Sequence, residues 1–95
     1  MSEVWICGIP YQIIEKETVD ENGGCLGQIL YRECVIEIRK GLPKELYTQT
    51  LIHEIVHGML SNIGKNDLAD NEEFVQALAM AINLTFDVKG DKENG

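Results

Sequence analysis

The sequence has few basic residues and no long apolar run. Its 95 residues include 8 Lys and Arg against 16 Asp and Glu, which gives a formal net charge of −8. This balance disfavours a nucleic acid or an anionic membrane as a partner, because both carry negative charge. No stretch approaches the ~20 apolar residues that a membrane-spanning helix needs. The N-terminal residues also lack the basic segment of a signal peptide, so we expect a cytoplasmic protein.

Cysteine is scarce and irregularly spaced. The three cysteines are Cys7, Cys25 and Cys34, and no two of them form a C-x-x-C pair. An odd number without that spacing fits neither a disulfide framework nor a zinc ribbon. We expect reduced thiols that are buried or half-buried, with a single Cys–Cys bridge or a reactive thiol as the alternative.

The first half of the chain has the apolar alternation of strands. The expected strands lie within residues 3–17, at 27–31 and at 34–40, and the turn-rich sequence DENGG at 20–24 separates the first two. Three strands in this order predict a small antiparallel sheet.

The second half of the chain has the three-to-four-residue apolar spacing of helices. This spacing predicts one helix over residues 46–63 and a second over about 72–86, with a polar loop between them. Pro43 suits the first turn of the first helix and Gly64 suits its end. The polar tail, about 87–95, is expected to be frayed. Together the patterns predict one α+β domain over residues 1–95, in which the sheet packs against both helices.

Both histidines of the chain lie in the stretch TLIHEIVHGML. This stretch contains an H-E-x-x-H motif, which consists of His53, Glu54 and His57. On a helix the two histidines lie about 40° apart at the edge of the apolar face, so both imidazoles can bind one zinc ion. Glu54 points toward open space, so it does not bind the metal but can take a proton from a zinc-bound water. The competing hypothesis is a helix that carries two surface histidines and no metal.

A catalytic zinc ion needs a third protein ligand, and the chain has no third histidine. The nearest candidates after the motif are Asp67, Asp70, Glu72 and Glu73. Glu72 lies at the edge of the apolar face of the second helix, whereas Glu73 falls about 100° away from it. Asp70 and Glu73 also fit a D-x-x-E capping box with Asp70 as the N-cap. We therefore expect the histidine pair and Glu72 to hold one zinc ion, with Glu73 as the alternative third ligand.

An H-E-x-x-H motif with a glutamate on the next helix resembles the gluzincin pattern of zinc metallopeptidases. Glu72 follows His57 by only 15 residues. That spacing is similar to the small phage- and prophage-encoded ImmA/IrrE-like peptidases and to the one-domain minigluzincins. The stretch EEFVQALA, residues 72–79, loosely resembles the E-x-x-A-N-x-F-A segment of many ImmA/IrrE-like peptidases, with Gln76 in place of the asparagine. The resemblance covers most of residues 27–86.

The resemblance implies a small zincin-like domain that hydrolyses peptide bonds, with a zinc-activated water and with Glu54 as general base and acid. It also implies a peptide or protein substrate that is held in extended form along a strand, here around Cys34–Lys40. By analogy with relatives that cleave repressors, the substrate belongs to phage or mobile-element regulation. The alternative is a catalytically weak or inactive module that keeps zinc for stability and binds a partner.

No residue is identified that stabilises the transition state. Tyr11, Tyr31 and Tyr47 are the candidates, but an amphipathic packing role is expected for each of them.

Overall fold

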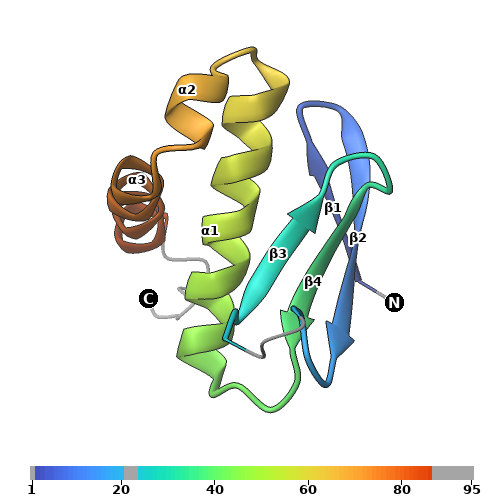
Figure 1. The fold of residues 1–95 in the computed structure, drawn as a ribbon. Coiled ribbons are helices and arrows are strands. Elements are labelled where there is room, and N and C mark those ends of the chain that lie inside the picture. The colour runs from blue at the N-terminus through green and yellow to red at the C-terminus, as the bar shows by residue number, and fades with distance from the viewer. Residues whose placement is uncertain (1, 21–23, 87–95) are drawn as a thin grey trace.

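The computed structural model describes residues 2–20 and 24–86 and shows a small α+β domain, as predicted. Figure 1 shows the sheet on one side of the molecule and the helices on the other. The frayed tail expected over 87–95 lies outside the described residues. The elements, in chain order, are β1 (Ser2–Ile6), β2 (Ile9–Lys16), β3 (Gly27–Leu30), β4 (Val35–Arg39), α1 (Lys44–Asn62), α2 (Asn66–Ala69) and α3 (Glu72–Thr85).

The sheet is mixed and has four strands in the order β1-β2-β4-β3, so the prediction of three antiparallel strands is wrong. Strands β2 and β4 are parallel, while the outer pairs are antiparallel. The expected single strand over 3–17 is two strands, because the chain reverses at Cys7 and Gly8, whose φ angles are 50° and 82°. A positive φ is common for glycine and uncommon for cysteine, so the first residue of this turn gives no turn signal.

Strand β4 lies inside the sheet because it is apolar on one face and covered on the other. Ile36 and Ile38 are fully buried against α1. On the opposite face, Glu37 is also buried and accepts a hydrogen bond from Gln28 Nε2 at 2.8 Å. The hairpin of β3 and β4 therefore joins the sheet through β4, and β3 is left at the edge.

The helix boundaries follow the local sequence. Helix α1 begins directly after Pro43, which is its N-cap and not part of its first turn as predicted. Gly64, with a φ of 83°, follows the end of the helix, as predicted. The N-cap of α3 is Asn71, whose side chain accepts a hydrogen bond from the Phe74 amide at 3.0 Å. The prediction of Asp70 as the N-cap is therefore wrong, since Asp70 instead closes α2, a short helix within the expected polar loop.

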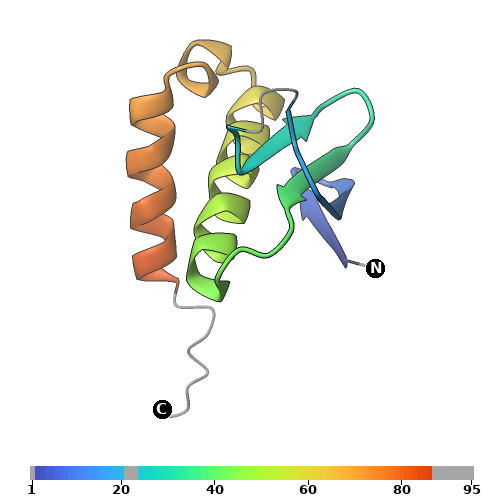
Figure 2. The same cartoon turned by 60° about the horizontal axis from the view of Figure 1, so that its bottom comes forward.

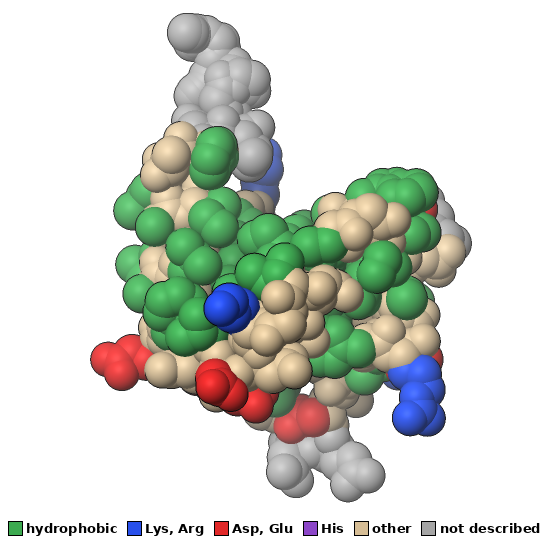
Figure 3. All heavy atoms as spheres, turned by 90° about the horizontal axis from the view of Figure 1, so that it is seen from above, with side chains coloured by type: hydrophobic (Ala, Val, Ile, Leu, Met, Phe, Trp, Pro, Cys, Tyr) green, Lys and Arg blue, Asp and Glu red, His purple; other side chains and the backbone are tan. Residues whose placement is uncertain are grey.

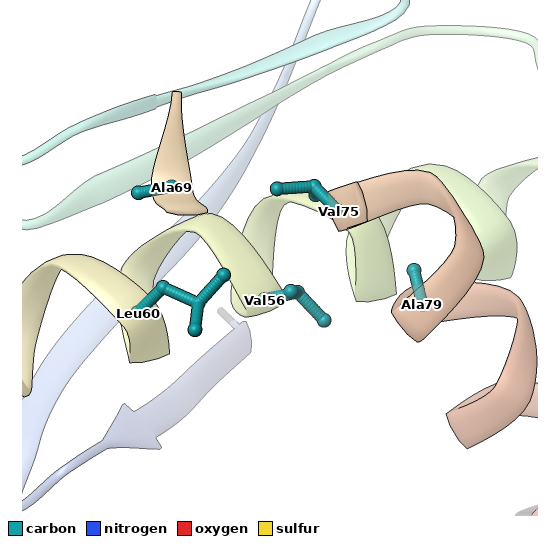
Figure 4. Close-up of a cluster of buried hydrophobic side chains, with 5 residues drawn as sticks. All are labelled: Val56, Leu60, Ala69, Val75 and Ala79. Atoms are coloured by element: carbon teal, nitrogen blue, oxygen red, sulfur yellow. The ribbon is translucent and has the colours of Figure 1, made fainter. Parts of the chain in front are cut away.

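The elements form three layers with α1 in the middle. Helix α1 contacts the sheet, and α3 packs on α1 and α2 without contacting the sheet in the described part of the chain (Figure 2). The sheet therefore packs against α1 and not against both predicted helices. The core between the helices, shown in Figure 4, consists of Val56, Leu60, Ala69, Val75 and Ala79. The core between α1 and the sheet is built around Ile6, Tyr11, Ile36 and Ile38.

The cysteines are free thiols, but they are less buried than predicted. Cys7 and Cys25 are exposed, and Cys34 is partly buried. Two of them lie in turns or loops beside the sheet and not in its core, which is why the expectation of buried thiols fails for them.

Several large apolar side chains are exposed on the surface. They include Trp5, Ile63, Met80 and Leu84, and Figure 3 shows that apolar side chains cover much of one face. Because exposed apolar residues occur in several places, exposure alone does not identify a binding surface here. Within residues 2–20 and 24–86 no helix has the length and apolar character needed to cross a membrane.

Candidate metal centre and cleft

The structure brings His53, His57 and Glu72 together where α1 meets the start of α3. The two histidines project from successive turns of α1, and Glu72 is the first residue of α3. His53 Nε2 lies 3.0 Å from Glu72 Oε1, and His57 Nε2 lies 3.1 Å from Glu72 Oε2. One donor atom from each of the three residues lies within 4.8 Å of the others.

The chemistry and spacing of this group fit a zinc ion. Ligands that surround zinc tetrahedrally at ~2.0–2.1 Å lie roughly 3.3 Å apart, close to the distances between the histidine nitrogens and the carboxylate. Imidazole nitrogens and a carboxylate oxygen are also the usual ligands of catalytic zinc. The side chains of His53 and His57 are 20% and 13% exposed, whereas that of Glu72 is 70% exposed. The group therefore lies at the rim between the core and the solvent.

Gln76 orients His53 from one turn further along α3. Its Oε1 lies 2.8 Å from His53 Nδ1. With Nδ1 as the protonated nitrogen, the Gln76 oxygen accepts its hydrogen, and the Nε2 lone pair points toward Glu72. A histidine that binds metal through one nitrogen commonly donates a hydrogen bond from the other, which fixes its ring and tautomer.

Glu54 is buried, although its position on the helix predicted open space. The residue is only 7% exposed, and burial raises the pKa of its carboxyl. The negative charge of Glu72 raises this pKa further, while His57 and His53 act in the opposite direction. The helical periodicity gave no sign of this burial, because the start of β3, which lies beside Glu54, comes from a distant part of the sequence.

Gly27 at the start of β3 lies beside Glu54. A Cβ at this position would lie 2.6 Å from Thr50 Cγ2, 3.2 Å from the Glu37 carbonyl oxygen and 3.5 Å from Glu54 Cγ. Only a residue without a side chain allows the strand to pass this close to α1. Gly58 plays a similar part on the helix, since a Cβ there would lie 3.0 Å from the tip of Ile29.

A cleft of about 600 Å³ opens between β3, α1 and the start of α3, and its lining includes the candidate metal-binding group of His53, His57 and Glu72. Strand β3 forms one wall along its free edge, since no other strand of the described residues pairs with that edge. The prediction that a substrate pairs with the strand around Cys34–Lys40 is therefore wrong, because β4 is already paired on both sides. The lining residues on β3 and its approach are Cys25, Leu26, Gly27, Gln28 and Ile29.

The three tyrosines occupy different environments. Tyr11 is buried in the core between sheet and helix, and Tyr47 packs against that core. Tyr31 lines the cleft, and its hydroxyl donates a hydrogen bond to the His57 carbonyl oxygen at 3.4 Å. Burial raises the pKa of Tyr31, with the charge of Glu54 acting in the same direction, so the hydroxyl stays protonated. Tyr31 is thus the one of the three that can act in the cleft.

The other acids considered as ligands lie outside the group. Asp67, Asp70 and Glu73 are exposed, and among the described residues none of them joins the two histidines. The contributions of Gly27 and the β3 edge were not predicted, because a glycine at the start of a strand is their only signal in the sequence.

The chain matches no protein-family model, no curated protein and no solved structure.

Proposed function

We propose that this protein is a zinc metallopeptidase of the gluzincin type that hydrolyses a peptide or protein substrate. One observation carries the proposal: His53, His57 and Glu72 converge in a cleft that also contains a buried glutamate and a free strand edge. These are the parts that metal-assisted hydrolysis of an extended peptide requires.

The histidine pair and Glu72 would hold the zinc ion, with Gln76 orienting His53. Zinc bound there would supply a Lewis acid that activates water and polarises the substrate carbonyl. The carboxylate of Glu72 would also lower the net charge of the bound metal centre.

Glu54 is the proposed general base and acid. It lines the cleft beside both histidines but lies outside the metal-binding group. Its burial raises the pKa of the carboxyl, which makes Glu54 a stronger acceptor for a proton from water. We propose that Glu54 takes a proton from the attacking water and passes it to the amine that leaves the cleaved bond.

The free edge of β3 is the proposed binding site for the substrate main chain. Arg39 N donates to Leu26 O at 2.8 Å, so Leu26 and the alternate residues after it face β4. In an antiparallel ladder this alternation leaves the peptide groups of Gly27 and Ile29 directed outward, toward the cleft. An extended peptide can therefore add to the sheet by main-chain hydrogen bonds.

We place the protein in the cytoplasm, consistent with the free thiols of Cys7, Cys25 and Cys34. We assign the substrate, by analogy with the ImmA/IrrE-like peptidases, to phage or mobile-element regulation.

The proposal is tested by incubating zinc-loaded protein with a complex peptide mixture and identifying new termini by mass spectrometry. Wild type should cleave, and Glu54→Gln should bind zinc equally well and lose at least about a hundredfold in rate. Glu73→Gln is the matched control, because it removes an exposed carboxylate from outside the metal-binding group. Equal cleavage by Glu54→Gln would eliminate the mechanism. Zinc binding without cleavage by wild type would favour the alternative of a zinc-stabilised binding module.

A further inference from the structure

A groove continues from the cleft into the corner between α1 and α3. Its volume is about 110 Å³, and it shares Gln49 and Gln76 with the cleft. A third hollow, which shares Gln49 and Asn83 with this groove, extends it toward the start of α1. The corner groove is lined by Gln49, Gln76, Ala79, Met80, Asn83 and Leu84.

The wall of the corner groove that α3 forms presents apolar side chains and an unsatisfied hydrogen-bond acceptor. Met80 is 50% exposed and Leu84 is 78% exposed. Asn83, which also lines the groove, has a buried Oδ1 without a hydrogen-bond partner among the described residues. A buried acceptor without a donor is rare in folded proteins and calls for a partner. The corner groove thus combines exposed apolar surface with an unmet hydrogen-bonding group.

Contacts between β3 and α1 fix the direction in which a bound peptide would run. The start of β3 lies beside Thr50, and Tyr31, just past its end, contacts His57 further along the helix. A peptide that pairs antiparallel with β3 therefore runs from the Tyr31 end toward the Thr50 end. Its C-terminal part leaves the strand edge next to Gln49, where the corner groove begins.

The distance from His53 to the corner groove determines which substrate residues reach the groove. Gln49 lies one helical turn before His53, or about 6 Å along the axis. An extended peptide covers this distance in about two residues at ~3.3 Å each. Met80 lies one helical turn beyond Gln76 on α3, so a bound peptide needs about two more residues to reach it.

We infer that the corner groove binds the part of the substrate that follows the scissile bond, with a large apolar side chain three or four residues past that bond packed against Met80 and Leu84. This inference rests on the proposed function, because the cleft sets the register of the peptide. It adds a substrate class: peptides with a large apolar residue at that distance on the C-terminal side.

The test uses short peptides with an N-terminal hydroxamate, a group that binds zinc and so places the following residues past the position of the scissile bond. One peptide has Leu at its third and fourth residues, and its partner has Ser at both. Isothermal titration calorimetry measures their affinities for zinc-loaded wild type and for Met80→Ser/Leu84→Ser. Ile63→Ser is the matched control, since Ile63 is 59% exposed and does not line the corner groove.

The Leu peptide should bind wild type and Ile63→Ser roughly tenfold more tightly than the Ser peptide. This preference should fall to about twofold or less in Met80→Ser/Leu84→Ser. The inference would be overturned if the two peptides bound wild type with equal affinity, or if the preference survived the double substitution. Neither result would contradict the proposed metal centre. Failure to bind zinc at all would overturn both the inference and the proposed function.

Discussion

Gly27 and Thr50 meet so closely that the contact leaves no room for a side chain at position 27. A Cβ there would lie 2.6 Å from Thr50 Cγ2. This approach brings the start of β3 beside Glu54 and makes the strand one wall of the cleft. The glycine therefore connects the packing of the fold with the position of the proposed catalytic carboxylate.

Gly27→Ala should destabilise the protein and impair hydrolysis together. The added methyl group must displace Thr50 or the strand, and overpacking of this kind costs about 1–3 kcal/mol. We expect at least a tenfold loss of hydrolysis with little loss of zinc affinity, because the three atoms nearest to the new Cβ belong to Thr50, Glu37 and Glu54 and not to a histidine. Thermal unfolding, zinc titration and peptide cleavage would measure the three effects.

Thr50→Ser provides the control for this prediction, because it removes the methyl group that the new Cβ would meet. The double variant Gly27→Ala/Thr50→Ser should recover part of the lost stability and activity. If Gly27→Ala alone behaves like wild type, the close approach does not position Glu54.

Gln76→Leu should weaken zinc binding by about 10–100-fold, the range seen when a hydrogen bond to a metal-binding histidine is removed. The substitution removes the acceptor that lies 2.8 Å from His53 Nδ1 and keeps a similar volume. Gln76→Glu should retain most of the affinity, because a carboxylate also accepts from Nδ1–H. Competition with a fluorescent zinc chelator gives the affinities, and an unchanged value for Gln76→Leu would show that this hydrogen bond does not orient His53.

Glu54→Gln should stabilise the metal-free protein at neutral pH. Burial raises the pKa of Glu54 in the folded chain, so the folded state keeps this proton to higher pH than the unfolded state does. The contribution of Glu54 to stability therefore falls as pH rises from the unfolded value, about 4.3, through the raised folded value. The free energy of unfolding of Glu54→Gln should therefore exceed that of wild type at pH 7, and the difference should vanish near pH 4.

Urea unfolding of both proteins between pH 4 and pH 8, with a chelator present, would measure this difference. A Gln variant that is less stable than wild type at pH 7 would mean that the ionised Glu54 is stabilised in the fold despite its burial.

The parts of the site that depend on one helix were predictable from the sequence. The spacing of His53 and His57 places both imidazoles on one side of α1, because i and i+4 residues of a helix are neighbours. The choice of Glu72 over Glu73 followed from the apolar face of the second helix, and the structure does place Glu72 beside both histidines. Local periodicity carries this information without knowledge of the rest of the fold.

The parts that depend on pairing between distant segments were not predictable. The position of β4 between β2 and β3 is set by burial on both of its faces, including a buried Glu37 that gives no apolar signal. Glu54 lies beside Gly27, which is 27 positions earlier in the chain, so its environment depends on how β3 packs on α1. Both features arise from long-range contacts, which a periodicity argument does not describe.

The measurement that tests the account most directly is the zinc content of the purified protein and of its Glu72→Ala and Glu73→Ala variants. We expect about one zinc ion per chain in wild type and in Glu73→Ala, and a large loss of affinity in Glu72→Ala. Mass spectrometry of the native protein, followed by titration of the metal-free forms with zinc, would give both values. Wild type that takes up no zinc, or a Glu72→Ala variant that holds it as tightly as wild type, would contradict the proposed three-ligand centre.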